Sequence, residues 1–305
     1  MEKVLIICGA GGIGRRVVEE MINYNFDKYK SVVFFDNNKS LTGTCVGGYE
    51  VISWEAMLQM CMDEECNIII ATNYWKELYK QIEEAGFANN VIDVIFDRKE
   101  DVGILNDSLS QEGEDLFLKE VFYGKRNGFY VDIGAHHPFR FSNTAWAYKK
   151  GWHGINIEPN DALISEFNVM RKRDINLACG IGMTNGVMRY YMFNEPALNN
   201  FTGEHMDIEE NGFIGIMEIP IRRLDEVLDS CLVDKIDFMS IDVEGMELEV
   251  LKSNNWEKYK PIYLLVEQCN LGIEDIFSND VYKYLKEIGY TLLAKTLRTS
   301  IYRCS

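Results

Sequence analysis

The sequence is short of basic residues. It has 31 lysines and arginines against 48 aspartates and glutamates, which gives a formal net charge of −17. Nucleic acids and anionic membranes are bound through basic patches, so this balance argues against both classes of partner. An acidic excess of this size serves mainly to keep a protein in solution.

Long apolar runs are also missing. No run approaches the roughly 20 residues that cross a bilayer, so we expect no membrane span. The opening residues 1–8 are too short for the apolar part of a signal peptide. The eight cysteines are scattered and form no C-x-x-C pair, which disfavours a disulfide framework and favours a reducing compartment. We therefore expect a cytoplasmic protein.

The chain is long enough for two domains with real cores, since 47% of its 305 residues are apolar. In residues 1–97 the first apolar run leads into a G-x-G-x-x-G turn made by Gly9, Gly11 and Gly14, and then into a helical segment. Such a turn receives a pyrophosphate at a helix N-terminus. Asp36 follows the second run at the spacing of an acid that holds a ribose. We predict a small Rossmann-like α/β domain with a nucleotide site.

A second α/β domain is predicted over residues 109–305, after a charged linker at 98–108. It opens with a strand–helix–strand unit at 128–159, whose two apolar runs end in Asp132 and Glu158. Ligands of parallel sheets bind beyond the C-terminal ends of the strands. We therefore expect both carboxylates at one site.

The turn after the first of these strands lacks the glycines of a dinucleotide site. Residues 132–138 have the sequence DIGAHHP, with a single glycine followed by bulky side chains. This turn suits a nucleoside without phosphates. A carboxylate at the strand end fits a positive centre, and a second one about 20 residues later fits two ribose hydroxyls. Together they indicate S-adenosylmethionine.

The same turn and five further motifs, in order along the chain, resemble the FkbM family of S-adenosylmethionine-dependent methyltransferases. The five are SQEGED at 110–115, SNT at 142–144, GWHG at 151–154, IDVEGME at 241–247 and the terminal strand at Glu267. The resemblance implies a class I methyltransferase domain, with a seven-stranded sheet closed by an antiparallel hairpin. It also implies O-methylation, which in this family often acts on sugars or polyketides.

The resemblance extends to the residues that contact the cofactor. These are Asp132, Gly134, Ala135, Asn143, Thr144, Glu158 and Cys179. Cys179 enters by position, because in this fold the third strand ends near the adenine, and the favoured alternative for it is a buried structural cysteine. The polar stretch at 194–212 is long for a connection in a compact domain, and it predicts a cover over the substrate.

Catalysis needs a group that takes the proton of the acceptor hydroxyl. Asp242 ends the central strand and is our first candidate. It either accepts the proton itself or joins Glu267 or Glu244 in holding a divalent metal, and both roles stay open. Adjacent residues rarely face the same ligand, so at most one of His136 and His137 is expected to take part, and we select His137.

The first domain resembles the N-terminal nucleotide-sugar-binding domain of PglD-like sugar acetyltransferases, on the glycine turn, residues 36–38 and the helix stop at Gly86. We therefore predict an O-methyltransferase of carbohydrate biosynthesis that acts on a sugar, a nucleotide-sugar or a surface-glycan precursor. Two alternatives stay open. One is an NAD-dependent oxidoreductase or epimerase, and the other is a non-catalytic binding module. The partners we expect are a small-molecule or glycan substrate and, as an option, further copies of the chain.

Overall fold

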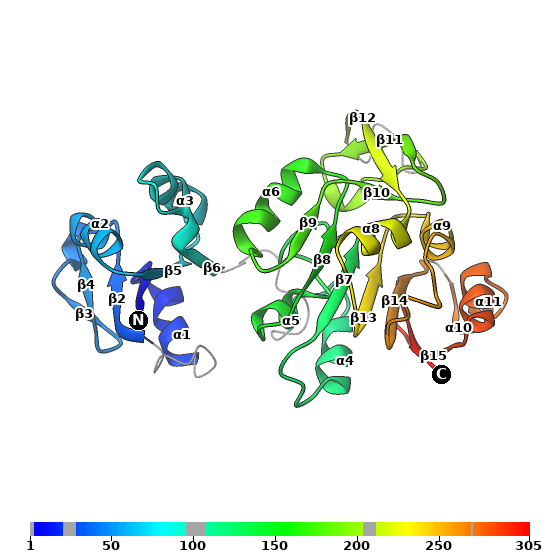
Figure 1. Ribbon diagram of the computed structural model, residues 1–305, viewed down its shortest axis with the longest axis horizontal. Coiled ribbons are helices and arrows are strands. Elements are labelled where there is room, and N and C mark those ends of the chain that lie inside the picture. The colour runs from blue at the N-terminus through cyan, green and yellow to red at the C-terminus, as the bar shows by residue number, and fades with distance from the viewer. Residues whose placement is uncertain (1–2, 21–28, 96–107, 204–211, 270) are drawn as a thin grey trace. The chain divides into compact units, whose positions relative to one another are not determined.

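The structure is a computed structural model that describes residues 3–20, 29–95, 108–203, 212–269 and 271–305. Its contacts divide the chain into two compact units, Met1–Glu100 (unit 1) and Asp101–Ser305 (unit 2), which Figure 1 draws in one view. Apart from residue 108, the predicted linker lies outside the described residues. Among the described helices, none is both long and apolar enough to cross a membrane.

Unit 1 is a six-stranded sheet in the order β3-β4-β2-β1-β5-β6, parallel except for the β3–β4 pair. Its elements are β1 (Lys3–Cys8), α1 (Gly12–Glu20), β2 (Tyr29–Phe35), η3 (Lys39–Leu41), β3 (Cys45–Val46), β4 (Tyr49–Ile52), α2 (Trp54–Asp63), β5 (Cys66–Ala71), α3 (Trp75–Glu84), η4 (Ala88–Asn90) and β6 (Val91–Ile95). The central strands β1 and β5 are almost wholly buried, which explains their continuous apolar sequence.

Unit 2 is built on a seven-stranded sheet in the order β15-β16-β14-β13-β7-β8-β9. Its strands are β7 (Phe129–Ile133), β8 (His153–Ile157), β9 (Ile175–Leu177), β13 (Phe238–Ile241), β14 (Tyr263–Glu267), β15 (Tyr290–Lys295) and β16 (Thr299–Cys304). All neighbours run parallel except β16, which is antiparallel to β14 and β15. The predicted α/β class and the seven-stranded sheet with its closing hairpin are confirmed.

Helices cover both faces of this sheet. The helices are α4 (Glu114–Val121), α5 (Ala145–Lys149), α6 (Asp161–Met170), α8 (Leu224–Ser230), α9 (Glu247–Lys252), α10 (Ile273–Ile276) and α11 (Asp280–Glu287). Side chains of α8, α9 and α11 pack with Val131 and Ile133 of β7, while those of α4 and α5 pack with Tyr130. Alternate residues of a strand point to opposite faces, so Asp132 shares the face of Tyr130.

Three further strands form a separate sheet at one end of unit 2 (Figure 1). They are β10 (Gly180–Ile181), β11 (Gly186–Phe193) and β12 (Phe213–Arg222), in the order β10-β12-β11. The alternating sequence of residues 187–193 predicts a strand added at the edge of the main sheet, and this prediction is wrong. The edge strand β9 is only three residues long, so it offers few backbone groups, and β11 instead pairs along its whole length with β12.

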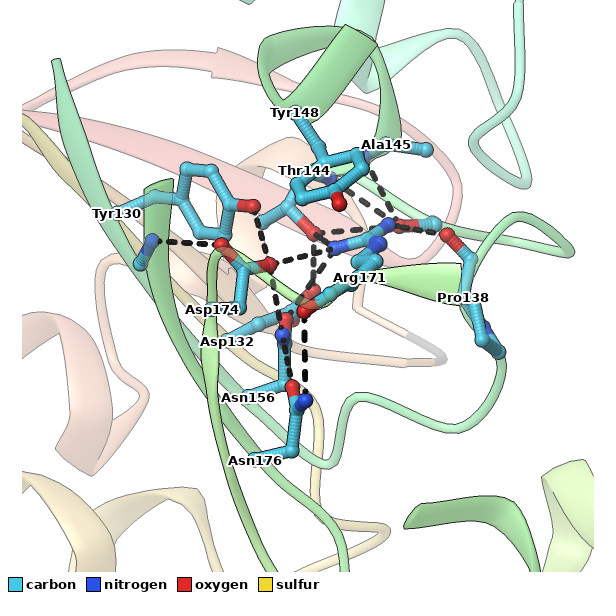
Figure 2. Close-up of polar contacts among 12 residues, drawn as sticks. Tyr130, Asp132, Pro138, Thr144, Ala145, Tyr148, Asn156, Arg171, Asp174 and Asn176 are labelled. Atoms are coloured by element: carbon cyan, nitrogen blue, oxygen red, sulfur yellow. Dashed lines mark hydrogen bonds and ion pairs between the residues drawn. The ribbon is translucent and has the colours of Figure 1, made fainter. Parts of the chain in front are cut away.

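A buried arginine joins several of these elements. Arg171 follows α6 and is fully buried, and Figure 2 shows its guanidinium surrounded by polar groups. Its partners are the carbonyl oxygen of Pro138, the hydroxyls of Ser142 (2.8 Å) and Thr144 (2.7 Å), the side-chain oxygen of Asn156 (3.2 Å) and the carboxylate of Asp174 (4.0 Å). Because a buried cation needs every partner it has, this residue ties the loop after β7 to β8 and to the turn before β9.

Replacing Arg171 by methionine should lower the free energy of unfolding by about 3–5 kcal/mol. The change removes a buried charge whose partners would remain buried without it. Urea denaturation of the full chain measures the loss.

The control is Arg173→Met. Arg173 is exposed, lies over the Tyr148 ring at 3.8 Å and donates to the Tyr148 carbonyl oxygen. Its loss should cost at most about 1 kcal/mol. Equal losses in the two variants would contradict the role assigned to Arg171.

Candidate active site

The strand order of unit 2 changes direction between β7 and β13. The chain passes from β7 to β8 and β9 on one side, while β13 and β14 lie on the other. In open α/β sheets ligands bind at this switch point, beyond the C-terminal strand ends. Gly134 follows β7 and has φ +77°, and a Cβ there would lie 1.6 Å from the carbonyl oxygen of Asp242, which follows β13. Only glycine lets the two strand ends approach this closely.

A cavity of about 960 Å³ opens at these strand ends. The loops after β7, β8, β13 and β14 line it, together with Tyr190 of β11, the segment after β11, residues 111–112 and the turn between β15 and β16. The residues used below are Gly134, His136 and Glu158, which we call the cofactor side, and Asp242, Glu244 and Glu267, which we call the acidic side.

Glu158 is the first residue after β8 and is 4% exposed. Its carboxylate accepts the backbone N–H groups of His136 (3.0 Å) and Asn160 (2.9 Å), and the Tyr190 hydroxyl lies at 3.5 Å. Burial raises the pKa of Glu158 to about 7, against the lowering effect of these hydrogen bonds. The carboxylate is therefore held in a fixed orientation on the cavity wall.

Backbone strain gathers at the cavity. Four non-glycine residues of the described chain have positive φ, and three of them line the cavity: His136 (51°), Phe141 (54°) and Glu244 (53°). Each such residue costs of order 1–3 kcal/mol and persists where the surrounding structure enforces it. Strain of this kind is typical of a functional site.

The acidic side brings three carboxylates together. One oxygen each from Asp242, Glu244 and Glu267 lies within 4.8 Å of the others, a spacing that could hold a metal ion. Burial and then the charge of Glu267 raise the pKa of Asp242 well above its usual range. Burial and then the charge of Glu244 raise the pKa of Glu267 to about 7. The two strand-end acids therefore hold a proton more readily than free carboxylates do.

Comparison with models of known families bears on both units. The Methyltransferase FkbM domain matches residues 132–292, which is more than half of the chain. The chain belongs to the FkbM methyltransferase family. The PglD N-terminal domain matches residues 4–72, so unit 1 is similar to that domain. A search of curated proteins found no match.

Two of the acids expected at the FkbM cofactor site occupy different environments. Glu158 lines the cavity, but Asp132 does not. Asp132 points into the face covered by α5, where its carboxylate accepts the Thr144 hydroxyl at 2.6 Å beside Arg171. Figure 2 places Asp132 and Thr144 in the arginine network. The difference follows from their places on the strands. Asp132 lies within β7, so its side chain points to one face of the sheet, whereas Glu158 follows the end of β8.

The remaining expected contacts lie behind the cavity wall. Asn143 donates to the Ser240 hydroxyl at 3.1 Å, and Ala135 packs against α6. Cys179 is buried in the core under α8, and its pKa is raised to about 11 by burial. Of the predicted cofactor residues, the cavity lining therefore includes Gly134 and Glu158.

The two histidines differ in their position relative to the cavity. His136 lines the cavity, whereas His137 does not. The His137 Nδ1 accepts the backbone N–H groups of Phe139 and Arg140, both at 3.0 Å, and its Nε2 lies 3.3 Å from Glu166. These contacts give His137 a role in holding the loop. The sequence did not reveal that these adjacent residues lie in different surroundings.

Part of the predicted cover lies where we expected it. Residues 196–199 and Phe201 line the cavity, while residues 204–211 lie outside the described chain. Tyr190, which contacts Glu158, was missed. The alternating pattern of residues 187–193 could have indicated an inward-facing tyrosine, but it does not show which site the strand faces.

The glycine turn of unit 1 divides into two kinds of position. A Cβ on Gly9 would lie 2.3 Å from the carbonyl oxygen of Ala71. A Cβ on Gly14 would lie 1.9 Å from the carbonyl oxygen of Gly9. These two glycines are required by packing. Gly11 is exposed, and a Cβ there meets nothing within 4 Å. The Asp36 carboxylate accepts the Ala10 and Asn38 N–H groups, both at 2.8 Å, and so shapes the turn.

Glu158→Gln should change how stability depends on pH. Between its unfolded pKa of about 4.5 and its folded pKa of about 7, the folded state keeps a proton that the unfolded state releases. The stability that this contributes is full below about pH 4.5 and is lost as the pH rises through 7. Between pH 4.5 and 8 the wild type should therefore lose up to about 3 kcal/mol more than Glu158→Gln, as measured by urea denaturation.

Asp161→Asn is the matched control, because it neutralises an exposed carboxylate three residues further along the chain, at the start of α6. Its curve gives the effect of removing one exposed carboxylate. Since Asp242 and Glu267 titrate in all three proteins, the difference between the curves isolates Glu158. Parallel wild-type and Glu158→Gln curves would contradict the raised pKa.

Proposed function

We propose that unit 2 is an S-adenosylmethionine-dependent O-methyltransferase that acts on a sugar hydroxyl. The observation that carries this proposal is the Glu158 carboxylate, held on the wall of a cavity at the switch point of a FkbM-family domain. A buried acid at the end of the second strand fits two vicinal ribose hydroxyls. Glu158 lines the cavity and accepts two N–H groups, which leaves its carboxylate able to accept further hydrogen bonds from a ligand.

The cavity also fits the rest of the cofactor. Its volume of about 960 Å³ leaves room for a nucleoside with its sulfonium chain and for part of an acceptor. Gly134 has no side chain, so its backbone forms part of the cavity wall. The turn lacks the glycine-rich loop whose amides bind phosphates. When bound, S-adenosylmethionine would supply a methyl group already activated by its positive sulfur. The protein's own task is then to align the acceptor oxygen and remove its proton.

Asp242 is the residue best placed to take that proton. It follows the central strand β13 and lines the cavity on the acidic side. A raised pKa brings a carboxyl closer to neutral pH, where a general base works best. In the alternative role, Asp242, Glu244 and Glu267 would hold a divalent cation, for which oxygen ligands are suited.

The charge of the lining restricts the acceptor. The carboxylates of Glu112, Asp242, Glu244 and Glu267 line the cavity, and Arg298 on the same wall pairs with Glu112 at 3.5 Å. Like charges repel strongly in a partly buried space. An uncharged or amine-bearing sugar ring is therefore the better acceptor. The phosphates of a nucleotide-linked acceptor would have to stay outside the cavity.

For unit 1 we propose recognition of a nucleotide-sugar or a related phosphorylated glycan precursor. Support comes from the match to the PglD N-terminal domain and from the open position at Gly11, where a pyrophosphate can approach the backbone at the start of α1. Methyl transfer uses no nicotinamide, so NAD would have no evident task here. The proposal links both units to glycan building.

Two variants of the cavity should separate binding from chemistry. Glu158→Ala should weaken S-adenosylmethionine by about 30- to 1000-fold, because it removes charge-assisted hydrogen bonds. Asp242→Asn should keep cofactor affinity within a few-fold and lower turnover by about 10²–10⁴. Calorimetry measures the affinity, and transfer of a labelled methyl group to a panel of sugars measures turnover.

Asp161→Ala serves as the control for cofactor binding. A chelator that lowers wild-type turnover as much as Asp242→Asn does would assign the acids to a metal. Unchanged cofactor affinity in Glu158→Ala would refute the ribose site. Full turnover in Asp242→Asn, with no chelator effect, would refute both roles of Asp242.

Gly11→Val should block the ligand of unit 1 without unfolding it. Gly11 lies outside the left-handed region, and a Cβ added there meets no protein atom within 4 Å, so we expect the fold to tolerate valine. The side chain would occupy the space a pyrophosphate needs. Thermal-shift titration with nucleoside diphosphate sugars and with NAD should show lost binding to unit 1 and unchanged binding of S-adenosylmethionine.

Gly9→Val is the comparison variant. Its Cβ would collide with the Ala71 carbonyl oxygen, so this variant should lose binding by unfolding unit 1. Wild-type protein that binds NAD in preference to every nucleotide-sugar would favour a nicotinamide-linked role instead. Undiminished nucleotide-sugar binding by Gly11→Val would refute the proposed position of the pyrophosphate.

A further inference from the structure

The loop after β7 and the segment after β11 are joined by one ion pair. The two terminal guanidinium nitrogens of Arg140 donate to the two carboxylate oxygens of Glu195, at 2.6 and 2.8 Å. The two residues are 55 positions apart in the chain. A two-point contact of this kind fixes orientation as well as distance. None of the contacts described above for the cofactor or the acceptor involves this pair.

Arg140 is anchored on the side of the β7 loop. Its guanidinium lies 4.3 Å from the centre of the Phe141 ring, and one of its nitrogens lies 3.3 Å from His136 Nε2. The Phe141 and His136 rings are themselves stacked, at 6.2 Å and 21°. Phe141 and His136 both line the cavity with positive φ. The arginine therefore braces the two strained residues of this loop from behind.

Glu195 is anchored on the side of the cover. Its carboxylate also accepts the Ala197 N–H at 3.2 Å, which caps the short helix η5 (Pro196–Leu198). The hydrogen bond from Arg140 lowers the pKa of Glu195, so the pair stays charged at neutral pH. Residues 196–199 form part of the cavity wall. The ion pair thus holds this wall against the β7 loop.

The same contacts lead to the expected cofactor carboxylate. His136 donates its backbone N–H to Glu158, and its side chain lies beside the Arg140 guanidinium. Tyr190, on β11 just before the cover, reaches Glu158 from the other side. Glu158 is therefore linked to the cover through His136, Arg140 and Glu195 in turn.

We propose that Arg140 is a positioning residue that clamps residues 195–199 over the cofactor side of the cavity and so sets how slowly the cofactor leaves. This inference rests on the proposed function, since it requires a cofactor beside Glu158. A wall that is ordered before binding lowers the entropy lost on binding. An ordinary surface ion pair contributes little to stability. This pair is bidentate, its arginine stacks on an aromatic ring, and both of its residues make further contacts.

The test uses Arg140→Met and Glu195→Gln in the full chain, with S-adenosylmethionine as the probe. Methionine keeps an apolar stem on Phe141 and removes the charge. Each variant should raise the cofactor dissociation rate, measured by stopped flow, about tenfold. The double variant should be no worse than either single one, because both remove the same contact. The KM for the cofactor should rise more than kcat falls.

Two further variants complete the test. Arg140→Lys keeps the charge but loses the fork geometry, so its dissociation rate should lie between those of wild type and Arg140→Met. Lys258→Met breaks the exposed pair with Asp229, whose carboxylate lies 2.6 Å away and outside the cavity lining, and it should leave dissociation unchanged. Glu195 is 43% exposed, so Glu195→Gln should fold even if Arg140→Met does not.

The outcomes separate the two proposals. Wild-type protein that binds no S-adenosylmethionine would overturn the proposed function, and the clamp with it. Wild-type binding with wild-type dissociation rates in Arg140→Met and Glu195→Gln would overturn the clamp alone. Additive effects on dissociation in the double variant would show that the two residues act separately, and would also overturn the clamp. A lower Tm with unchanged dissociation would show that the pair serves stability only.

Discussion

The buried charge of Arg171 is the constraint on which the site of unit 2 depends. A guanidinium out of water is stable only with its hydrogen bonds made, and here the acceptors come from separate segments. One segment is the loop from Pro138 to Thr144, which follows Gly134 and His136 and itself contains Phe141, all three of them in the cavity lining. Satisfying the arginine therefore also sets the course of that loop. Asp132 belongs to the same network, so its charge supports the site from within the core.

Strain and burial are concentrated where the chemistry is proposed. His136, Phe141 and Glu244 hold unfavourable backbone angles, and Glu158 and Glu267 hold carboxylates in surroundings that raise their pKa values. None of this stabilises the free protein. The cost is offset by the large apolar cores on both faces of the sheet. A ligand that meets these carboxylates would recover part of it.

The glycine turns of the two units differ in what they offer to an approaching ligand. In unit 1 the packing glycines, Gly9 and Gly14, close the turn and leave Gly11 bare to solvent. In unit 2 the single glycine of the turn, Gly134, is used to bring two strand ends together, and acids rather than amides face the cavity. The first arrangement suits phosphate and the second suits ribose and a positive centre. This contrast is visible in the spacing of glycines alone.

The sequence by itself determined the α/β class and the strand ends that carry Glu158 and Asp242, because strand ends follow from local apolar patterns. The seven-stranded sheet and the FkbM membership were expected from the resemblance of six ordered motifs to that family. The alternation of residues 130–133 also held the information that Asp132 faces away from the cavity, although we did not use it. Only the tertiary structure decided the rest. It put His136 and not His137 in the cavity lining, and it placed β11 in a separate sheet. It also joined Arg140 to Glu195 across 55 residues, since such contacts depend on how distant segments pack rather than on any local pattern.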